Sequence, residues 1–146
     1  MNHDSGRVSR TTAFPHPVSV LVVDDHPLLR EGLQCLFRSC DEFEVIGEAA
    51  DGKQGCELAQ QLQPDVVLMD IELPKMNGIE ATRWINAHVP HVVVVGLSIN
   101  TSAAMADEMT SAGAAAYLTK DSTPEHFYRV IRSALTHKIC PYTTSA

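Results

Sequence analysis

The chain has 146 residues, of which 45% are hydrophobic and 20% are charged, and its formal net charge is -7. This composition is ordinary for one soluble globular domain, and the acidic balance argues against a chain that binds nucleic acid by itself, because phosphate contacts need clustered Lys and Arg. The four cysteines form no zinc-ligand pattern, and the chain shows neither a secretory signal nor an apolar run of membrane-spanning length, so we expect a cytoplasmic protein that does not contact membranes.

Two kinds of apolar pattern alternate along the chain after a polar start. Residues 1–17 have no hydrophobic period and are predicted to be a flexible leader. Short runs of mainly apolar residues, of which 18–23 is rich in β-branched side chains, predict five strands, at 18–23, 43–49, 65–69, 91–97 and 115–118. Apolar residues at helical spacing predict five helices, at 27–39, 55–62, 79–87, 101–112 and 123–135. Residues 137–146 are predicted to be a tail or a linker.

This alternation of strands and helices predicts a single α/β domain over residues 18–136. Strand–helix–strand units call for a parallel sheet with right-handed crossovers. The expected architecture is a flavodoxin-like, doubly wound, five-stranded parallel sheet in the order 2-1-3-4-5, with five helices. In that order the first and third strands are neighbours.

Polar side chains stand where four of the predicted strands end. The strand-end residues are Asp24 and Asp25, then Asp70, Ser98 and Lys120. Because parallel strands all end at the same edge of a sheet, we expect these five side chains to share one crevice. The sequence therefore predicts a site made of three carboxylates, one hydroxyl and one ammonium.

The chemistry of these groups indicates phosphoryl transfer. Three adjacent carboxylates repel one another and attract a cation, and oxygen ligands suit Mg²⁺ or Mn²⁺. A carboxylate such as Asp70 is also a competent nucleophile toward phosphorus, while Lys120 and Ser98 can stabilise charge on the transferred oxygens.

Each of these residues also has an ordinary structural explanation. A single Asp after a strand is most often a helix cap or a solvated turn residue, and a single Lys there is usually a surface charge. His26 follows the acid pair, and a role at the start of the next helix is favoured over a ligand role. The occurrence of all five polar residues at their expected strand ends is what favours a functional site.

Three stretches of the sequence resemble a known family. They are residues 24–33 (DDHPLLREGL), 69–82 (MDIELPKMNGIEAT) and 113–121 (GAAAYLTKD). On these motifs the chain resembles the receiver domain of bacterial two-component response regulators, which has the CheY-like form of the fold above. Within that family it is most similar to the nitrate/nitrogen-fixation subgroup (NarL/FixJ type) of transcription regulators.

The resemblance implies a role for each strand-end residue. Asp70 would accept a phosphoryl group from a sensor histidine kinase, and Lys120 would contact the phosphoryl oxygens. Asp25 would bind the metal directly and Asp24 chiefly through water or a supporting contact, while Asp70 itself and the backbone carbonyl of Glu72 would complete the protein ligands.

The resemblance also implies a switch. Ser98 would move toward the phosphate, and Tyr117 would turn inward as the coupled aromatic residue. The structural alternative for Tyr117 is an ordinary half-buried aromatic of a strand, which the pattern supports equally well.

The function expected from the resemblance is that of a phosphorylation-controlled switch, not of an enzyme, although the domain would promote its own phosphoryl transfer and dephosphorylation. We would then expect the chain to form a homodimer after phosphorylation. It would contact DNA only through an output domain beyond this chain. One alternative is a stand-alone phosphotransfer or interaction module. The other is an aspartyl-phosphate phosphohydrolase, which is disfavoured because Asp70-Ile71-Glu72-Leu73-Pro74 lacks the DxDx[TV] pattern of such enzymes.

Overall fold

Five parallel strands form one central sheet in the order β2-β1-β3-β4-β5, as the sequence predicts. The computed structural model describes residues 16–73, 75–99 and 102–139. The strands are β1 (Val18–Val23), β2 (Phe43–Ala49), β3 (Val66–Asp70), β4 (Val93–Ser98) and β5 (Ala116–Thr119). The helices are α1 (Pro27–Arg38), α2 (Gly52–Leu62), α3 (Gly78–His88), α4 (Ala103–Ala112) and α5 (Pro124–Ile139).

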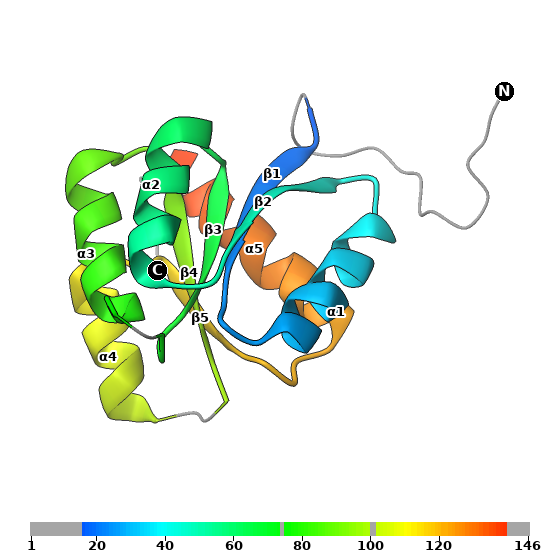
Figure 1. The fold of residues 1–146 in the computed structure, drawn as a ribbon. Coiled ribbons are helices and arrows are strands. Elements are labelled where there is room, and N and C mark those ends of the chain that lie inside the picture. Colours follow the sequence, from blue (N-terminus) through cyan, green and yellow to red (C-terminus); the bar gives the residue numbers. More distant parts are fainter. Residues whose placement is uncertain (1–15, 74, 100–101, 140–146) are drawn as a thin grey trace, which may run out of the picture.

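The helices cover both faces of the sheet (Figure 1). Helices α1 and α5 pack on one face, where Phe37 and Ile131 join the buried residues of the strands. Helices α2, α3 and α4 pack on the other, where Ala59, Ile85 and Met109 lie in the second buried cluster. Strand β3 is buried at every position because both of its faces are covered.

Several helix ends are decided by capping residues. Asn77 caps α3 as its side chain accepts a hydrogen bond from the Glu80 backbone N–H at 2.9 Å, and the Asn77 backbone N–H donates one to the Glu80 carboxylate in return. Gly113 ends α4 in the left-handed conformation, with a φ of 116°. The end of α4 at Ala112 is the one expected from the sequence, and α3 begins one residue before the expected start at residue 79.

Other element boundaries differ by a few residues. Helix α2 begins at Gly52 instead of residue 55, because the Asp51 side chain caps it by accepting a hydrogen bond from the Gln54 N–H at 2.8 Å. Strand β4 begins at Val93, two residues later than expected. Helix α5 continues to Ile139, past the expected end at residue 135. The predicted leader and tail lie largely outside the described residues.

No helix in the described part of the chain is long and apolar enough to cross a membrane. Three of the four cysteines, Cys35, Cys40 and Cys56, form no disulfide within the described part of the chain, and Cys140 lies outside it.

Candidate functional site

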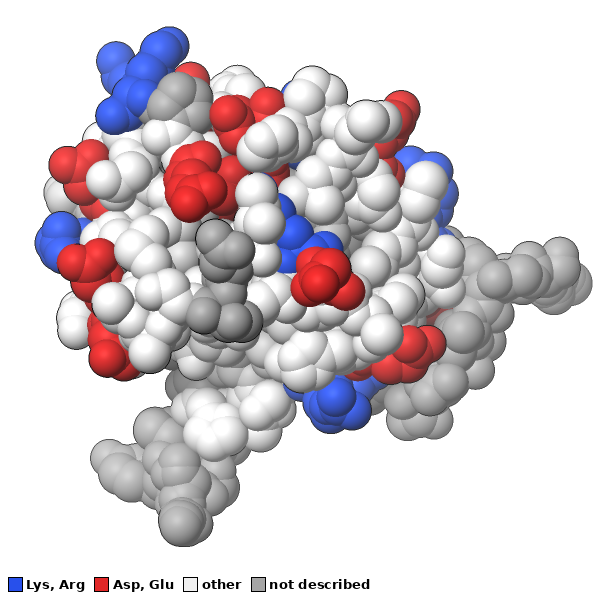
Figure 2. Space-filling view, turned by 90° about the horizontal axis from the view of Figure 1, so that it is seen from below, with Lys and Arg blue, Asp and Glu red and all other residues white. Residues whose placement is uncertain are grey.

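The polar residues predicted at the strand ends meet at the carboxyl edge of the sheet. Asp24 directly follows β1, Asp70 and Ser98 are the last residues of β3 and β4, and Lys120 directly follows β5. The pairing of Val23 with Met69 places the ends of β1 and β3 side by side. Seen from this edge, basic atoms lie recessed between acidic side chains (Figure 2).

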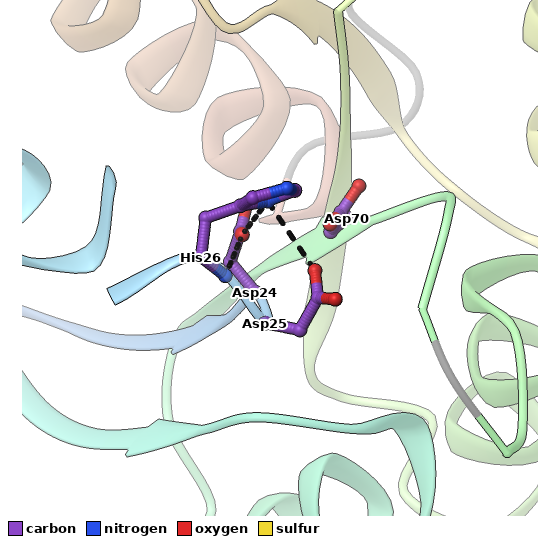
Figure 3. A group of neighbouring side chains, drawn as sticks. All are labelled: Asp24, Asp25, His26 and Asp70. Atoms are coloured by element: carbon purple, nitrogen blue, oxygen red, sulfur yellow. Dashed lines mark hydrogen bonds and ion pairs between the residues drawn. The ribbon is translucent and has the colours of Figure 1, made fainter. Parts of the chain in front are cut away.

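An acidic cluster forms the centre of the site (Figure 3). Asp24, Asp25, His26 and Asp70 each offer one ligand atom, and these atoms all lie within 4.8 Å of one another. Asp24 and Asp70 are fully buried, whereas Asp25 and His26 are partly open to solvent. The sequence predicted the three carboxylates correctly as neighbours.

Lys120 provides positive charge in this cluster. Its Nζ lies 2.9 Å from Asp24 Oδ2 and 3.1 Å from Asp70 Oδ2, and its side chain is 11% exposed. Burial by itself lowers the pKa of the Lys120 ammonium, but the contacts with Asp24 and Asp70 outweigh it, so that the pKa is raised. Lys120 therefore remains charged at neutral pH.

One ammonium is not enough to balance these buried carboxylates. Burial and the charge of Asp24 raise the pKa of the Asp70 carboxyl to about 6, against the lowering effect of Lys120 and of the Glu72 backbone N–H. Although Lys120 stands at ion-pair distance, Asp24 Oδ2 and Asp70 Oδ2 have no hydrogen-bond partner among the described residues, and neither has Asp25 Oδ1. Lys120 thus supplies positive charge to both Asp24 and Asp70.

Three buried oxygens without hydrogen-bond partners, all from carboxylates, are a donor set that fits a hard divalent cation. Such a cation would relieve the repulsion that raises the pKa of Asp70. The open side of the cluster, next to Asp25, leaves room for water ligands, which Mg²⁺ usually keeps.

The segment after β3 holds the Asp70 carboxylate through a backbone hydrogen bond. The backbone N–H of Glu72 donates a hydrogen bond to Asp70 Oδ1 at 3.1 Å, while the Glu72 side chain is exposed. Gly78 folds back against this segment, and a Cβ at that position would lie 2.1 Å from the Asp70 carbonyl oxygen. The ligand role of the Glu72 carbonyl stays a prediction.

Ser98 and Tyr117 lie on neighbouring strands beside the acidic cluster. Ser98 is 5% exposed, and its carbonyl accepts a hydrogen bond from the Lys120 backbone N–H at 2.8 Å. Tyr117 pairs with Gly96 across β4 and β5 and packs, half-buried, against the second core cluster. Their switch roles stay predictions.

The structure adds two residues that the sequence did not assign to the site. His26 occupies the N-cap position of α1, but its side chain makes no capping bond; its Nδ1 lies 2.9 Å from Asp24 Oδ1 and 3.3 Å from Asp25 Oδ1. Arg30 donates a hydrogen bond to the Asp24 carbonyl oxygen. A basic residue one turn into the helix that follows an acid pair is a signal that could have pointed to Arg30.

Comparison with known proteins is consistent with this arrangement. Residues 20–132 match the family described as the response regulator receiver domain. The chain is 36% identical over 115 residues to the transcriptional regulatory protein DegU of Brevibacillus brevis, covering 79% of this chain and 49% of that protein. It is 35% identical over 118 residues to the nitrate/nitrite response regulator NarL of Escherichia coli K12, covering 81% of this chain and 55% of that protein. The chain thus spans about half the length of these curated relatives.

Solved structures show the same likeness. A two-component response regulator of the LuxR family from Aurantimonas sp. SI85-9A1 superposes with a TM-score of 0.78 at 34% identity, covering 82% of this chain and 86% of that one. The signal receiver domain of a NarL response regulator from Mycobacterium tuberculosis superposes with a TM-score of 0.77 at 32% identity, covering 84% of this chain and 98% of that one.

Proposed function

The chain belongs to the response regulator receiver domain family, and from that premise we propose that it is a phosphorylation-controlled switch whose phosphoacceptor is Asp70. The observation that carries the proposal is the place of Asp70. It is a fully buried carboxylate at the end of β3, beside Asp24 and Lys120, with one oxygen that lacks a hydrogen-bond partner.

Each residue of the cluster would have its own role in phosphoryl transfer. The Asp70 carboxylate forms the new P–O bond as the P–N bond of a phosphohistidine donor on a sensor kinase breaks. The Glu72 N–H holds the other carboxylate oxygen of Asp70 and so orients the nucleophile. Lys120, already within 3.1 Å of Asp70, stabilises the charge on the transferred oxygens.

Asp24, Asp25 and the Glu72 carbonyl would hold Mg²⁺ or Mn²⁺ at this place. When bound, the cation offsets the negative charge that the three carboxylates and the phosphoryl group bring together. The three buried carboxylate oxygens that have no hydrogen-bond partner among the described residues support this assignment.

The switch itself would run from Asp70 along the carboxyl edge of the sheet. Ser98 ends the strand next to β3, and Tyr117 lies on the strand beyond it. A phosphoryl group on Asp70 would draw the Ser98 hydroxyl toward it, and Tyr117 would move into the space vacated. The resulting change would alter the surface of β5 and α5, where a second copy of the chain or an output domain would bind.

The output is proposed to be transcription. Curated relatives are named transcriptional regulatory proteins, and the chain matches about half of their length. DNA would therefore be contacted by a further domain of the whole protein. No feature of the described site favours the phosphohydrolase alternative, and the stand-alone module differs only in lacking that domain.

Replacing the phosphoacceptor tests the proposal. Asp70→Asn removes the nucleophilic oxygen, and we expect no Mg²⁺-dependent labelling by a small phosphodonor such as acetyl phosphate, measured by intact mass spectrometry. Asp107→Asn, an exposed carboxylate on α4, is the matched control and should label like the wild type. Undiminished labelling of Asp70→Asn would contradict the assignment.

A further inference from the structure

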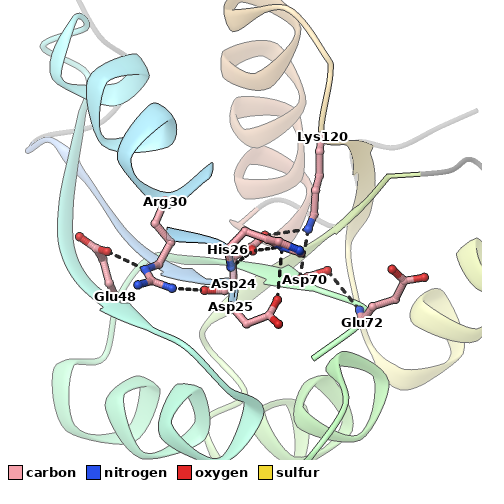
Figure 4. Close-up of polar contacts among 8 residues, drawn as sticks. All are labelled: Asp24, Asp25, His26, Arg30, Glu48, Asp70, Glu72 and Lys120. Atoms are coloured by element: carbon pink, nitrogen blue, oxygen red, sulfur yellow. Dashed lines mark hydrogen bonds and ion pairs between the residues drawn. The ribbon is translucent and has the colours of Figure 1, made fainter. Parts of the chain in front are cut away.

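Arg30 links the acid pair to the neighbouring helix and strand (Figure 4). From the first turn of α1 it donates a hydrogen bond through one terminal guanidinium nitrogen to the Asp24 carbonyl oxygen, at 2.5 Å. Its Nε donates a second hydrogen bond to Glu48 Oε1 on β2, at 2.9 Å. One side chain thereby joins three elements of the fold at the edge of the site.

The hydrogen bond to the Asp24 carbonyl matters because Asp24 lies one residue beyond the end of β1. The Asp24 N–H still pairs with the Ala49 carbonyl of β2 at 3.0 Å, but its own carbonyl lies beyond the strand, which ends at Val23. Arg30 provides that carbonyl with its donor. Both backbone groups of Asp24 are therefore held, and this fixes the direction in which the Asp24 and Asp25 carboxylates leave the chain.

Glu48 holds the guanidinium in place and balances its charge. It accepts a hydrogen bond from Gln34 of α1 as well as from Arg30, so the carboxylate itself is oriented from two sides. A guanidinium next to a cation site would repel the cation if its charge were not balanced. The Arg30–Glu48 pair thus offers a rigid hydrogen-bond donor without a net positive charge.

We propose that Arg30, held by Glu48, is a positioning residue for the cation site: by fixing the backbone of Asp24, it sets the acid pair in the geometry that binds the divalent cation. The inference rests on the proposed function. Partners that orient metal ligands typically change metal affinity by about 10- to 100-fold when they are removed.

A purely structural ion pair would behave differently. With side-chain exposures of 20% for Arg30 and 37% for Glu48, it would contribute about 1 kcal/mol or less to the free energy of unfolding and would leave the cation affinity unchanged. The affinity for Mg²⁺ is therefore the informative measurement.

The experiment follows the Mg²⁺ dissociation constant in the whole chain, from amide chemical shifts around Asp70 during a MgCl₂ titration. We expect Arg30→Ala to raise that constant by at least about tenfold. Glu48→Ala should raise it by a smaller factor, because Arg30 keeps its bond to Asp24. Arg30→Lys should recover part of the loss, because an ammonium can reach one of the two acceptors with a single donor.

A second readout separates cation affinity from chemistry. In labelling by acetyl phosphate, Arg30→Ala should need about tenfold more Mg²⁺ for half-maximal rate, yet reach a rate within about twofold of the wild type at saturating Mg²⁺. Two arginine variants serve as controls. Arg38→Ala changes an exposed residue of the same helix, and Arg132→Lys changes the arginine of another ion pair, with Glu42. Neither should shift the Mg²⁺ dependence.

The outcomes distinguish the positioning role of Arg30 from the proposed phosphorylation of Asp70. A Mg²⁺ constant for Arg30→Ala within about twofold of the wild type, or an equal shift in Arg38→Ala, would overturn the positioning role while the wild type still labels. A wild type that neither binds Mg²⁺ nor labels would overturn the proposed function as well.

Discussion

The two ends of the sheet treat buried carboxylates in opposite ways. At the amino edge, Glu42 is 5% exposed and is fully paired: Arg132 of α5 reaches both carboxylate oxygens, with three hydrogen bonds of 2.9–3.2 Å. At the carboxyl edge, Asp24 and Asp70 are fully buried and share the single ammonium of Lys120. The first arrangement leaves both Glu42 oxygens bonded, and the second leaves three aspartate oxygens without a hydrogen bond from any residue that the structure describes.

This difference indicates which end serves structure and which serves binding. A carboxylate whose two oxygens are both held by one guanidinium has its charge balanced and offers little to a cation. Carboxylates with unmet charge and unmet hydrogen bonds lower stability until a cation arrives. Buried acids are thus structural where they are satisfied and functional where they are not.

The sharpest way to test the comparison is to remove the partner at the amino edge. Arg132→Ala leaves Glu42 buried without its guanidinium, and we expect the free energy of unfolding to fall by about 3 kcal/mol. Urea unfolding measures this. Arg129→Ala, at an exposed position of the same helix, should change it by less than about 0.5 kcal/mol. An Arg132 variant as stable as Arg129→Ala would show that the pair is not structural.

The corresponding change at the carboxyl edge should have the opposite sign. Without divalent cations at pH 7, Asp70→Asn removes a buried charge that the fold disfavours, and we expect the free energy of unfolding to rise by about 2 kcal/mol. The cause is burial together with the charge of Asp24, which raise the pKa of the Asp70 carboxyl to about 6. A lower free energy of unfolding in this variant would contradict the view that the charge of Asp70 destabilises the cation-free protein.

The pH dependence follows from the same raised pKa. The folded protein holds the Asp70 proton more tightly than the unfolded chain, in which the pKa is 3.8. The stability that this proton brings is complete below pH 3.8 and is lost as the pH rises to about 6. The gain of Asp70→Asn over the wild type should therefore grow across that window and level off above it. A gain that is constant with pH would assign the effect to packing instead.

The smallest expected effect is that of the cation. Mg²⁺ at ten times its dissociation constant should raise the free energy of unfolding of the wild type by about 1.4 kcal/mol. Thermal unfolding with and without MgCl₂ measures it. Asp24→Asn should lose this gain, whereas Arg132→Ala should keep it, because its change lies at the far edge of the sheet. Equal gains in both variants would remove the distinction between the two edges.

Much of the site was predictable because it depends on where strands end. Asp70 and Lys120 are far apart in the chain, but the alternation of strands and helices places both at one edge of the sheet, where the structure has Lys120 Nζ 3.1 Å from Asp70 Oδ2. The capping box of Asn77 and Glu80 is also local, because a cap and its partner are separated by three residues. Such features need only the local pattern and the handedness of the crossovers.

The sequence by itself therefore determined the fold class, the strand order and the set of polar residues at the carboxyl edge. Only the tertiary structure decided which partners those residues have. Hydrophobic periodicity shows which face of a helix is buried, but not which side chain of a neighbouring element it contacts. For this reason the pairing of Arg30 with Glu48 of β2 and the pairing of Glu42 with Arg132 across 90 residues became visible only once the elements had packed.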